Sequence, residues 1–268
     1  MNQISSDQIR QNVRNRYKEA ALQPVENSSV CFPSSSCCGS SADYTDISSK
    51  LGYSSEEMNS VPAGANLGLG CGNPQTIAGL KPGEVILDLG SGGGFDCFLA
   101  SRQVGETGRV IGVDMTPEMV SRARMNAVNG GFANADFRLG EIEHLPVPDQ
   151  TVDVIISNCV INLSPAKQLV FDEAFRVLRS GGRLAISDIV MTAELPAEIK
   201  NDLGAMYSGC ISGASSVEDI RAMLTKSGFT EVVVEPKDES RAFIKNWVPG
   251  ADVENYIQAA VIKGIKPE

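Results

Sequence analysis

The sequence predicts an α/β fold in which a mostly parallel sheet has helices packed on both faces. From residue 84 onward, apolar segments of strand length alternate with helical stretches, which is the pattern of parallel strands joined by crossover helices. A glycine-rich loop joins the first of these strands to the first helix. The chain has 268 residues, of which 42% are hydrophobic, so it can build one sizeable core.

The N-terminal part, residues 1–80, is predicted to begin with a helix and to continue into a loop. The stretch "SSDQIRQNVRNRYKEAA" at 5–21 reads as a polar helix with a Ser/Asp start. Residues 24–45 are rich in serine, hold three cysteines and show no apolar periodicity, so we expect a loop there. A helix start near Ser54 and the glycine-rich "GANLGLGCGNPQTIAGL", ending in a short helix, complete this part.

The central part, residues 81–190, is predicted to hold five strands. They are read from "EVILDLG", "GRVIGVDM", "ADFRLGE", "VDVIISNCV" and "GRLAISDIV". Helices are expected between them at 95–104, 117–129 and 166–178. The second of these helices has the clearest start, because Thr116 is a good N-cap and Pro117 suits the first helical position.

The remaining part, residues 191–268, is predicted to close the sheet edge. The segment "SVEDIRAMLTKSGF" reads as a helix with Ser216 as its cap. The segments "TEVVVEP" and "RAFIKNW" are strand or helix candidates, and we expect "NYIQAAVIKGI" to form a closing strand.

Composition excludes several classes of function. The formal net charge is −10 and the isoelectric point is about 4.7, so the surface repels phosphate backbones and we expect no nucleic-acid partner. We find no run of 18 apolar residues and no signal-peptide core in the first 30 residues, so we predict a cytoplasmic monomer without a membrane partner. The seven cysteines are odd in number and dispersed, unlike a secreted disulfide scaffold. The single histidine, His144, argues against a His-rich metal site and against a Ser-His-Asp apparatus.

The glycine-rich loop "ILDLGSGGGFD" indicates a nucleotide-like ligand. Gly90, Gly92 and Gly94 let the backbone pass close beneath a ligand, but a dinucleotide fingerprint fails because Phe95 occupies its sixth position. Asp114 ends the second strand about 20 residues later, where an acid can accept both ribose hydroxyls. The combination fits a nucleoside without phosphates.

Residues 84–190 resemble the class I S-adenosylmethionine-dependent methyltransferases. The stretch from Asp88 to Gly94 is similar to their first motif, 112–115 to their second, and "GEIEHLPVPDQTVDVIISN" to the segment that folds over the adenine and forms strand four. The resemblance implies a Rossmann-like, seven-stranded, mostly parallel sheet and S-adenosylmethionine as cofactor. Another Rossmann-type binder is the alternative. The cofactor residues that it implies are Gly90, Ser91, Gly92, Asp114, Met115, Thr116, Ile142, Glu143 and Asn158.

Three cysteines fall in loops that such a fold brings together. Ligands bind at the carboxyl ends of parallel strands, so Cys159 after strand four is expected in or beside the crevice. Cys71 lies in the segment before the core and Cys210 follows strand five, whereas Cys97 falls inside a helix and is expected to pack. Structural zinc usually requires C-x2-4-C pairs, which we do not find. Trivalent arsenic, which forms three thiolate bonds and keeps a lone pair, fits three soft ligands.

The stretches "LGLGCGNP", "DLGSGGGFDCFLAS", "VDVIISNCVINLSPAKQ" and "GCISGA" together resemble the arsenite S-adenosylmethionine methyltransferases. The resemblance covers nearly the whole chain and places the C-terminal part on the substrate side. It implies that Cys71, Cys159 and Cys210 hold arsenic(III). A fourth thiol is implied within 31–38, for which we favour Cys38 and then Cys37.

The resemblance predicts a mechanism for arsenic detoxification. Arsenite, free or as a thiol adduct, exchanges onto the cysteines, and its lone pair attacks the sulfonium methyl without a general base. Reduction of the product is expected to form a disulfide, for which Cys38 with Cys71 is our choice, reset by thioredoxin or a glutathione-like thiol. Repeated rounds would yield mono- and dimethylated arsenicals.

Two other functions remain open at this stage. A class I methyltransferase for a carbon or oxygen acceptor, such as a quinone precursor, would not depend on arsenite. A non-enzymatic metalloid-binding protein would bind arsenite without releasing S-adenosylhomocysteine, although the glycine loop and Asp114 speak against it.

Overall fold

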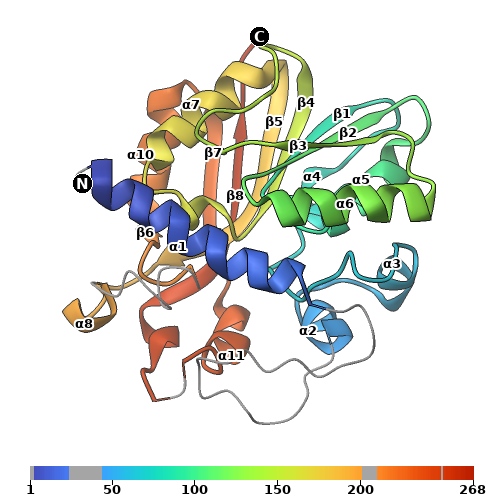
Figure 1. Cartoon of the computed structure of the whole chain (residues 1–268). Helices are drawn as coiled ribbons and strands as arrows, with labels where there is room; N and C mark the ends of the chain where they lie inside the picture. The colour runs from blue at the N-terminus through green and yellow to red at the C-terminus, as the bar shows by residue number, and fades with distance from the viewer. Residues whose placement is uncertain (1–2, 24–43, 201–209, 249) are drawn as a thin grey trace.

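A single mixed sheet runs through the molecule and carries helices on both faces (Figure 1). The computed structural model describes residues 3–23, 44–200, 210–248 and 250–268. The main path of the sheet follows the strand order β3-β2-β1-β4-β5-β8-β7, and a short strand, β6, pairs with β5. The strands are β1 (Val85–Leu89), β2 (Arg109–Asp114), β3 (Ala135–Leu139), β4 (Val152–Asn158), β5 (Leu178–Met191), β6 (Ser215–Ser216), β7 (Thr230–Pro236) and β8 (Ile257–Ile265).

The pairing of the strands confirms the predicted sheet. β1, β2, β3, β4 and β5 are mutually parallel, and β8 runs antiparallel between β5 and β7. The segment "NYIQAAVIKGI" therefore supplies the closing strand, as expected. The segment "RAFIKNW" supplies a helical turn, α11 (Arg241–Ile244), after a 3-10 turn at Asp238–Ser240.

Alternate residues of the central strands pack against different helices, which is why these strands read as continuous apolar runs. Leu87 and Leu89 of β1 join a cluster with α7 (Lys167–Val177) and α10 (Val217–Ser227). Ile86 faces the opposite way and joins a cluster with α5 (Phe95–Val104) and α6 (Pro117–Gly130). All three side chains are fully buried.

The helix caps follow the local sequence. Thr116 occupies the N-cap of α6, with proline next to it, and the Ser216 hydroxyl accepts a hydrogen bond from the Asp219 amide at the start of α10. Ser54 and Glu57 form a capping box on α3 (Ser55–Asn59). The sequence missed α2 (Tyr44–Lys50), which begins at the end of the serine-rich stretch, because two serines interrupt its short apolar pattern.

The carboxyl ends of β1, β2, β4 and β5 meet at one edge of the sheet, and the longest helix, α1 (Gln3–Ala21), crosses this edge (Figure 1). α1 contacts α6 and the 3-10 turn Ile161–Leu163 that follows β4. The short helices α4 (Gln75–Ala78) and α8 (Ala197–Lys200) and the 3-10 turn Val253–Asn255 complete the described elements. Within the described ranges, no helix is long and apolar enough to cross a membrane.

Two glycines that directly follow helices α6 and α10 allow a test of local packing. Gly131 and Gly228 both adopt a positive φ, but a Cβ on Gly131 would have open space while one on Gly228 would lie 2.9 Å from the Phe175 ring. That ring packs edge-to-face on Phe229 at 5.3 Å and cannot easily move. We expect Gly131→Ala to lower the free energy of unfolding by about 1 kcal/mol and Gly228→Ala by at least about 1 kcal/mol more. Urea denaturation measures both, and equal losses would contradict this packing.

Candidate active site

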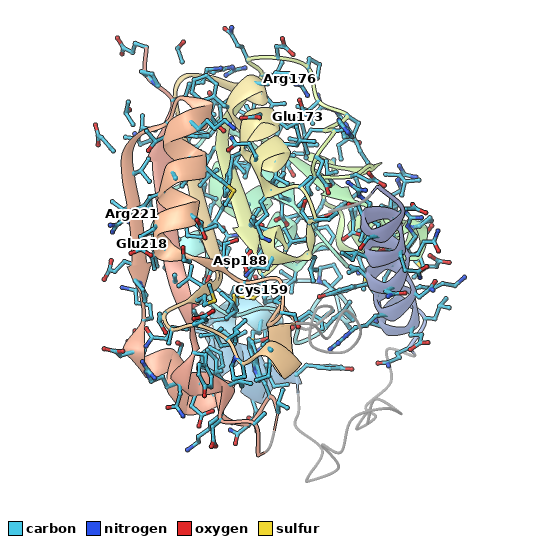
Figure 2. The ribbon with its side chains drawn as sticks, turned by 90° about the vertical axis from the view of Figure 1, so that its left-hand side faces the viewer. Cys159, Glu173, Arg176, Asp188, Glu218 and Arg221 are labelled. Carbon is cyan, nitrogen blue, oxygen red and sulfur yellow. A yellow bond between two sulfur atoms is a disulfide. The ribbon has the colours of Figure 1, made fainter. Side chains whose placement is uncertain are left out.

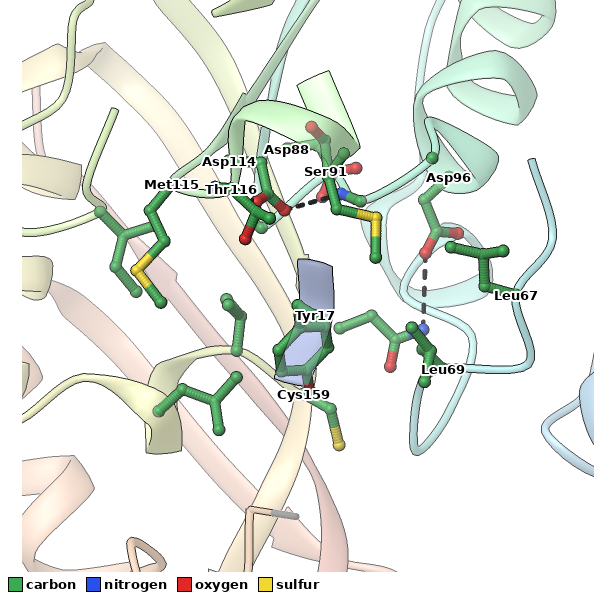
Figure 3. A pocket seen from close by; sticks show the side chains of 18 of the residues that line it. Tyr17, Leu67, Leu69, Asp88, Ser91, Asp96, Asp114, Met115, Thr116 and Cys159 are labelled. Atoms are coloured by element: carbon green, nitrogen blue, oxygen red, sulfur yellow. Dashed lines mark hydrogen bonds between the residues drawn. The ribbon is translucent and has the colours of Figure 1, made fainter. Parts of the chain in front are cut away.

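A pocket lies at the carboxyl edge of the sheet, beneath α1 (Figure 3). The space between its walls, counted out to its open mouth, is about 1070 Å³. The structure brings together all nine residues that the sequence assigned to a cofactor. The members of this set that line the pocket are Gly90, Ser91, Gly92, Asp114, Met115, Thr116, Ile142, Glu143 and Asn158.

The loop after β1 is anchored to β2 on one side and faces open space on the other. The amides of Gly90 and Ser91 donate to the Val113 carbonyl at 2.8 and 3.1 Å, which anchors the loop to β2. A Cβ added to Gly92 would meet no atom within 4 Å, so this position faces open space. The Ser91 hydroxyl is buried and has no hydrogen-bond partner among the described residues. The loop therefore presents an unused polar group where a ligand would lie.

Asp114 ends β2 with its carboxylate held by the loops on either side. Its two oxygens accept hydrogen bonds from the Gly92 amide at 3.0 Å and the Thr116 amide at 2.8 Å. Burial raises the pKa of this carboxyl, while those two backbone hydrogen bonds lower it. The carboxylate is thus oriented by the backbone and keeps lone pairs for a hydroxyl-bearing ligand.

Glu143 lies at another wall of the pocket and is tied to α1. Its Oε1 accepts hydrogen bonds from the Arg10 guanidinium at 3.0 Å and from the Ser164 hydroxyl at 2.7 Å. Arg10 also forms an ion pair with Glu141 at 3.4 Å. The sequence missed the contribution of α1 because this helix reads as polar overall. The signal was present in Ile9 and Val13, two buried apolar residues at helical spacing.

Asn158 lines the pocket, but its amide group is already engaged. Its Nδ2 donates to the Gly72 carbonyl at 2.8 Å and to the Tyr53 hydroxyl at 3.1 Å. Its Oδ1 accepts from the Cys71 amide at 2.9 Å. The sequence assigned this side chain to the cofactor; the geometry shows that it also fixes the segment that carries Cys71.

Two further acids line the pocket, Asp88 and Asp96. Asp96 accepts a 2.8 Å hydrogen bond from Tyr53, and the Cys97 thiol donates to Asp88 at 3.2 Å. Cys97 therefore does more than fill space in α5. Burial raises the pKa of both carboxyls, and the neighbouring Asp96 raises that of Asp88 further.

Three of the predicted thiols lie together, and one of them, Cys159, lines the pocket. Cys71 and Cys159, 88 residues apart in sequence, form a disulfide with 5.8 Å between their Cα atoms. The thiol of Cys210 donates to the Cys159 carbonyl at 3.0 Å. Burial raises the pKa of the Cys210 thiol, and the nearby Asp188 carboxylate raises it further.

The sequence did not identify Asp188, which lies beside the two bonded sulfurs. One of its oxygens and the sulfurs of Cys71 and Cys159 all lie within 4.8 Å of one another. Figure 2 shows Cys159, just after β4, close to Asp188 of β5. Asp188 accepts hydrogen bonds from the Ile161 amide at 2.8 Å and the Asn162 side chain at 2.9 Å. Burial raises the pKa of Asp188 to about 6. The one sequence feature that could have indicated Asp188 is that it is an acidic residue within an otherwise apolar strand.

One predicted pairing differs from the structure. The sequence favoured a disulfide between Cys38 and Cys71, whereas Cys71 is bonded to Cys159 here. Cys71 can form one disulfide at a time, so the two pairings belong to different states. Cys31, Cys37 and Cys38 lie outside the described residues, and their roles stay predictions.

Comparisons with known proteins point to one family. Residues 80–228 match a family described as "Methyltransferase domain". The arsenite methyltransferase of Halobacterium salinarum is 53% identical over 231 residues, and that of Aquipseudomonas alcaligenes is 36% identical over 230. These alignments cover 86% and 83% of this chain, but only 59% and 62% of the two relatives. The chain thus spans about three fifths of the length of these curated relatives.

A solved structure supports the same grouping. The crystal structure of CrArsM, an arsenic(III) S-adenosylmethionine methyltransferase from Chlamydomonas reinhardtii, matches with a TM-score of 0.60 and 33% identity. The match covers 83% of this chain and 73% of that one. A phosphoethanolamine N-methyltransferase from Haemonchus contortus, at 18% identity and a TM-score of 0.61, shows the fold alone.

Because the pocket contains buried acids, we expect that replacing one of them by a neutral residue changes the free energy of unfolding in a pH-dependent way. The folded-state pKa of Asp88 is raised, so the wild type loses stability as pH rises above the unfolded-state pKa and toward the folded one. Asp88→Asn cannot ionise, so we expect its unfolding free energy relative to wild type to increase as pH rises from 5 to 8. Urea unfolding at the two pH values measures this growth.

A surface carboxyl serves as the control. Glu173 hydrogen-bonds to Arg176 on α7 (Figure 2), and this contact lowers its pKa. Its contribution is lost only as pH falls through the depressed pKa, so the effect of Glu173→Gln should be constant from pH 6 to pH 8. A constant effect of Asp88→Asn between pH 5 and pH 8 would instead contradict a pKa raised well above its usual value at Asp88.

Proposed function

The chain belongs to the arsenite methyltransferase family, and from this premise we propose that it transfers a methyl group from S-adenosylmethionine to trivalent arsenic held by cysteine thiolates. The observation that carries the proposal is the disulfide-linked pair Cys71 and Cys159, with Cys210 in contact, where Cys159 lines the same pocket as the glycine loop and Asp114. The wider role that we propose is arsenic detoxification in the cytoplasm by a monomeric enzyme.

The residues of the pocket fit the cofactor. The unpartnered Ser91 hydroxyl and the open space above Gly92 suit the polar methionine and ribose parts. Asp114, with its carboxylate oriented by two amides, would accept the ribose hydroxyls. Ile142 and Glu143 would border the adenine. When bound, S-adenosylmethionine supplies an electrophilic methyl group on a sulfonium.

The substrate end requires free thiols, so the disulfide between Cys71 and Cys159 must first be reduced. Each thiol that then binds arsenite replaces one hydroxyl group of As(OH)3 and releases one water, giving an As–S bond. Arsenic brought as a thiol adduct would exchange thiol for thiol instead. Cys159 and Cys210 are the ligands that we favour, with Cys71 as the third, because the Cys159 main chain already contacts the Cys210 thiol.

Methyl transfer needs no proton acceptor. The arsenic lone pair becomes the As–C bond, so arsenic is formally oxidised by two electrons. Two protein thiolates can return those electrons by forming a disulfide, and the Cys71–Cys159 bond is the product expected of that step. Cys38 would exchange with Cys71 in a later step. A thioredoxin-like or glutathione-like thiol would then restore the reduced enzyme.

We expect arsenite-dependent methylation that requires both Cys159 and Cys210. Incubation with arsenite, S-adenosylmethionine and a thiol should give methylarsenicals by mass spectrometry. Cys159→Ser and Cys210→Ser should each lower the rate by at least about 100-fold, because a serine hydroxyl is a poor ligand for a soft ion. Cys97→Ser keeps a donor to Asp88 and should retain most of the activity. Wild-type protein that makes no methylarsenic at any thiol concentration would sink the proposal.

Withholding the reductant tests the redox step. Enzyme that is pre-reduced and then freed of thiol should transfer no more than a few methyl groups per chain, because each reduction of arsenic consumes two thiolates. Mass mapping of the spent enzyme should find Cys71 in a disulfide, either with Cys159 or, after the exchange, with Cys38. Sustained turnover without any added thiol or thioredoxin system would show that the protein cysteines do not supply the electrons.

A further inference from the structure

Helix α1 turns one face toward the pocket, and its role goes beyond covering it. Arg10, Val13 and Tyr17 follow one another at helical spacing and all three line the pocket. Arg10 contacts Glu143, as described above. Tyr17 lies almost two helical turns further along α1. The end of α1 is fixed by the Arg122 guanidinium, which donates to the Ala21 carbonyl at 2.9 Å.

The ring of Tyr17 lies where the cofactor half of the pocket meets the thiol half. It packs against the apolar cluster that contains Cys71 and Cys210, and also against a second cluster with Met119. Figure 3 shows the ring between Asp114 on one side and Cys159 on the other. A methyl group that travels from the glycine loop to the thiols would therefore pass close to this ring.

The carboxylates of the pocket are already engaged by the protein. Asp114 accepts from two amides, Glu143 from Arg10 and Ser164, Asp96 from Tyr53, and Asp88 from Cys97. Two aromatic side chains occur in the described lining, Tyr17 and Phe95. The Phe95 ring is in edge contact with Tyr53, with 4.9 Å between centroids. Of these two rings, Tyr17 is the one that packs in the cluster with Cys71 and Cys210.

We propose that the Tyr17 ring recognises the sulfonium charge and makes the pocket prefer S-adenosylmethionine to its neutral product, S-adenosylhomocysteine. This inference rests on the proposed function. The π face of a tyrosine attracts a cation, most strongly where water is excluded. The two ligands share their adenosine and amino-acid groups, so this contact appears in the ratio of their affinities. Such a preference lets fresh cofactor displace the product between successive methylations.

The surroundings keep the ring neutral. Burial raises the pKa of the Tyr17 hydroxyl well above its usual value, and nearby Cys210, Asp114 and Asp188 raise it further. The phenol therefore stays protonated, and the preference arises from the π face rather than from a phenolate.

Calorimetric titration of the full chain with each ligand tests the inference. The measured quantity is the ratio of the dissociation constants of S-adenosylhomocysteine and S-adenosylmethionine. It is compared among wild type, Tyr17→Phe and Tyr17→Leu. Phenylalanine keeps the π face, so the ratio should stay within about 3-fold of wild type. Leucine removes it, and the preference for S-adenosylmethionine should fall by about 5- to 30-fold. Tyr17→Met repeats the test if the leucine variant does not fold, and retained S-adenosylhomocysteine binding reports folding.

Phe95→Leu is the matched control, because it makes an aromatic-to-aliphatic change elsewhere in the same pocket. It should alter both dissociation constants by the same factor. If Tyr17→Leu weakened both ligands equally, the ring would be packing only and the inference would fall. These titrations contain no arsenite, so an absence of methylarsenic products would overturn the proposed function while leaving the outcome for Tyr17 readable.

Discussion

The side chain of Asn158 is the contact on which the rest of the site depends. It stands at the end of β4, one residue before Cys159, and its amide holds both the amide of Cys71 and the carbonyl of Gly72. Two chain segments far apart in sequence are thereby brought to disulfide distance. The same amide reaches the Tyr53 hydroxyl, which in turn donates to Asp96 in the pocket wall. One partly buried carboxamide thus links the geometry of the thiols to that of the pocket.

The glycines around Cys71 follow from this close contact. A Cβ on Gly70 would lie 2.9 Å from the Asn158 amide nitrogen, and a Cβ on Gly72 would collide with the Ser187 side chain. The residues on either side of Cys71 must lack side chains for this segment to approach β4 and β5 so closely. The three-residue sequence Gly-Cys-Gly is therefore a steric requirement for placing this sulfur, independent of the chemistry that the sulfur performs.

The fold was largely predictable because its signals are local and repeated. Apolar strands, helix starts and the glycine loop each appear within a few residues, and helices on both faces leave only one layered arrangement for them. The nine pocket residues came from the resemblance to class I methyltransferases, whose cofactor site is built from strand ends and the loops after them. Asp188, Arg10 and Tyr17 could not be found in this way. Their positions depend on which face of a strand or helix meets the pocket, and this is set by tertiary packing.

Two of the thiols lie on strained backbone. Cys159 and Cys210 both have positive φ angles, 57° and 65°, which are uncommon for residues with a Cβ. Asp188 offsets this at Cys159 by accepting hydrogen bonds from Ile161 and Asn162, which hold the chain just beyond it. That anchor is itself a buried acid with a raised pKa, so strain and desolvation are concentrated around the same sulfurs. An apolar residue in place of the acid would avoid the desolvation but would lose the hydrogen bonds that hold this backbone. The coincidence of strain and desolvation beside a disulfide argues that stability has been exchanged here for the placement of sulfur atoms.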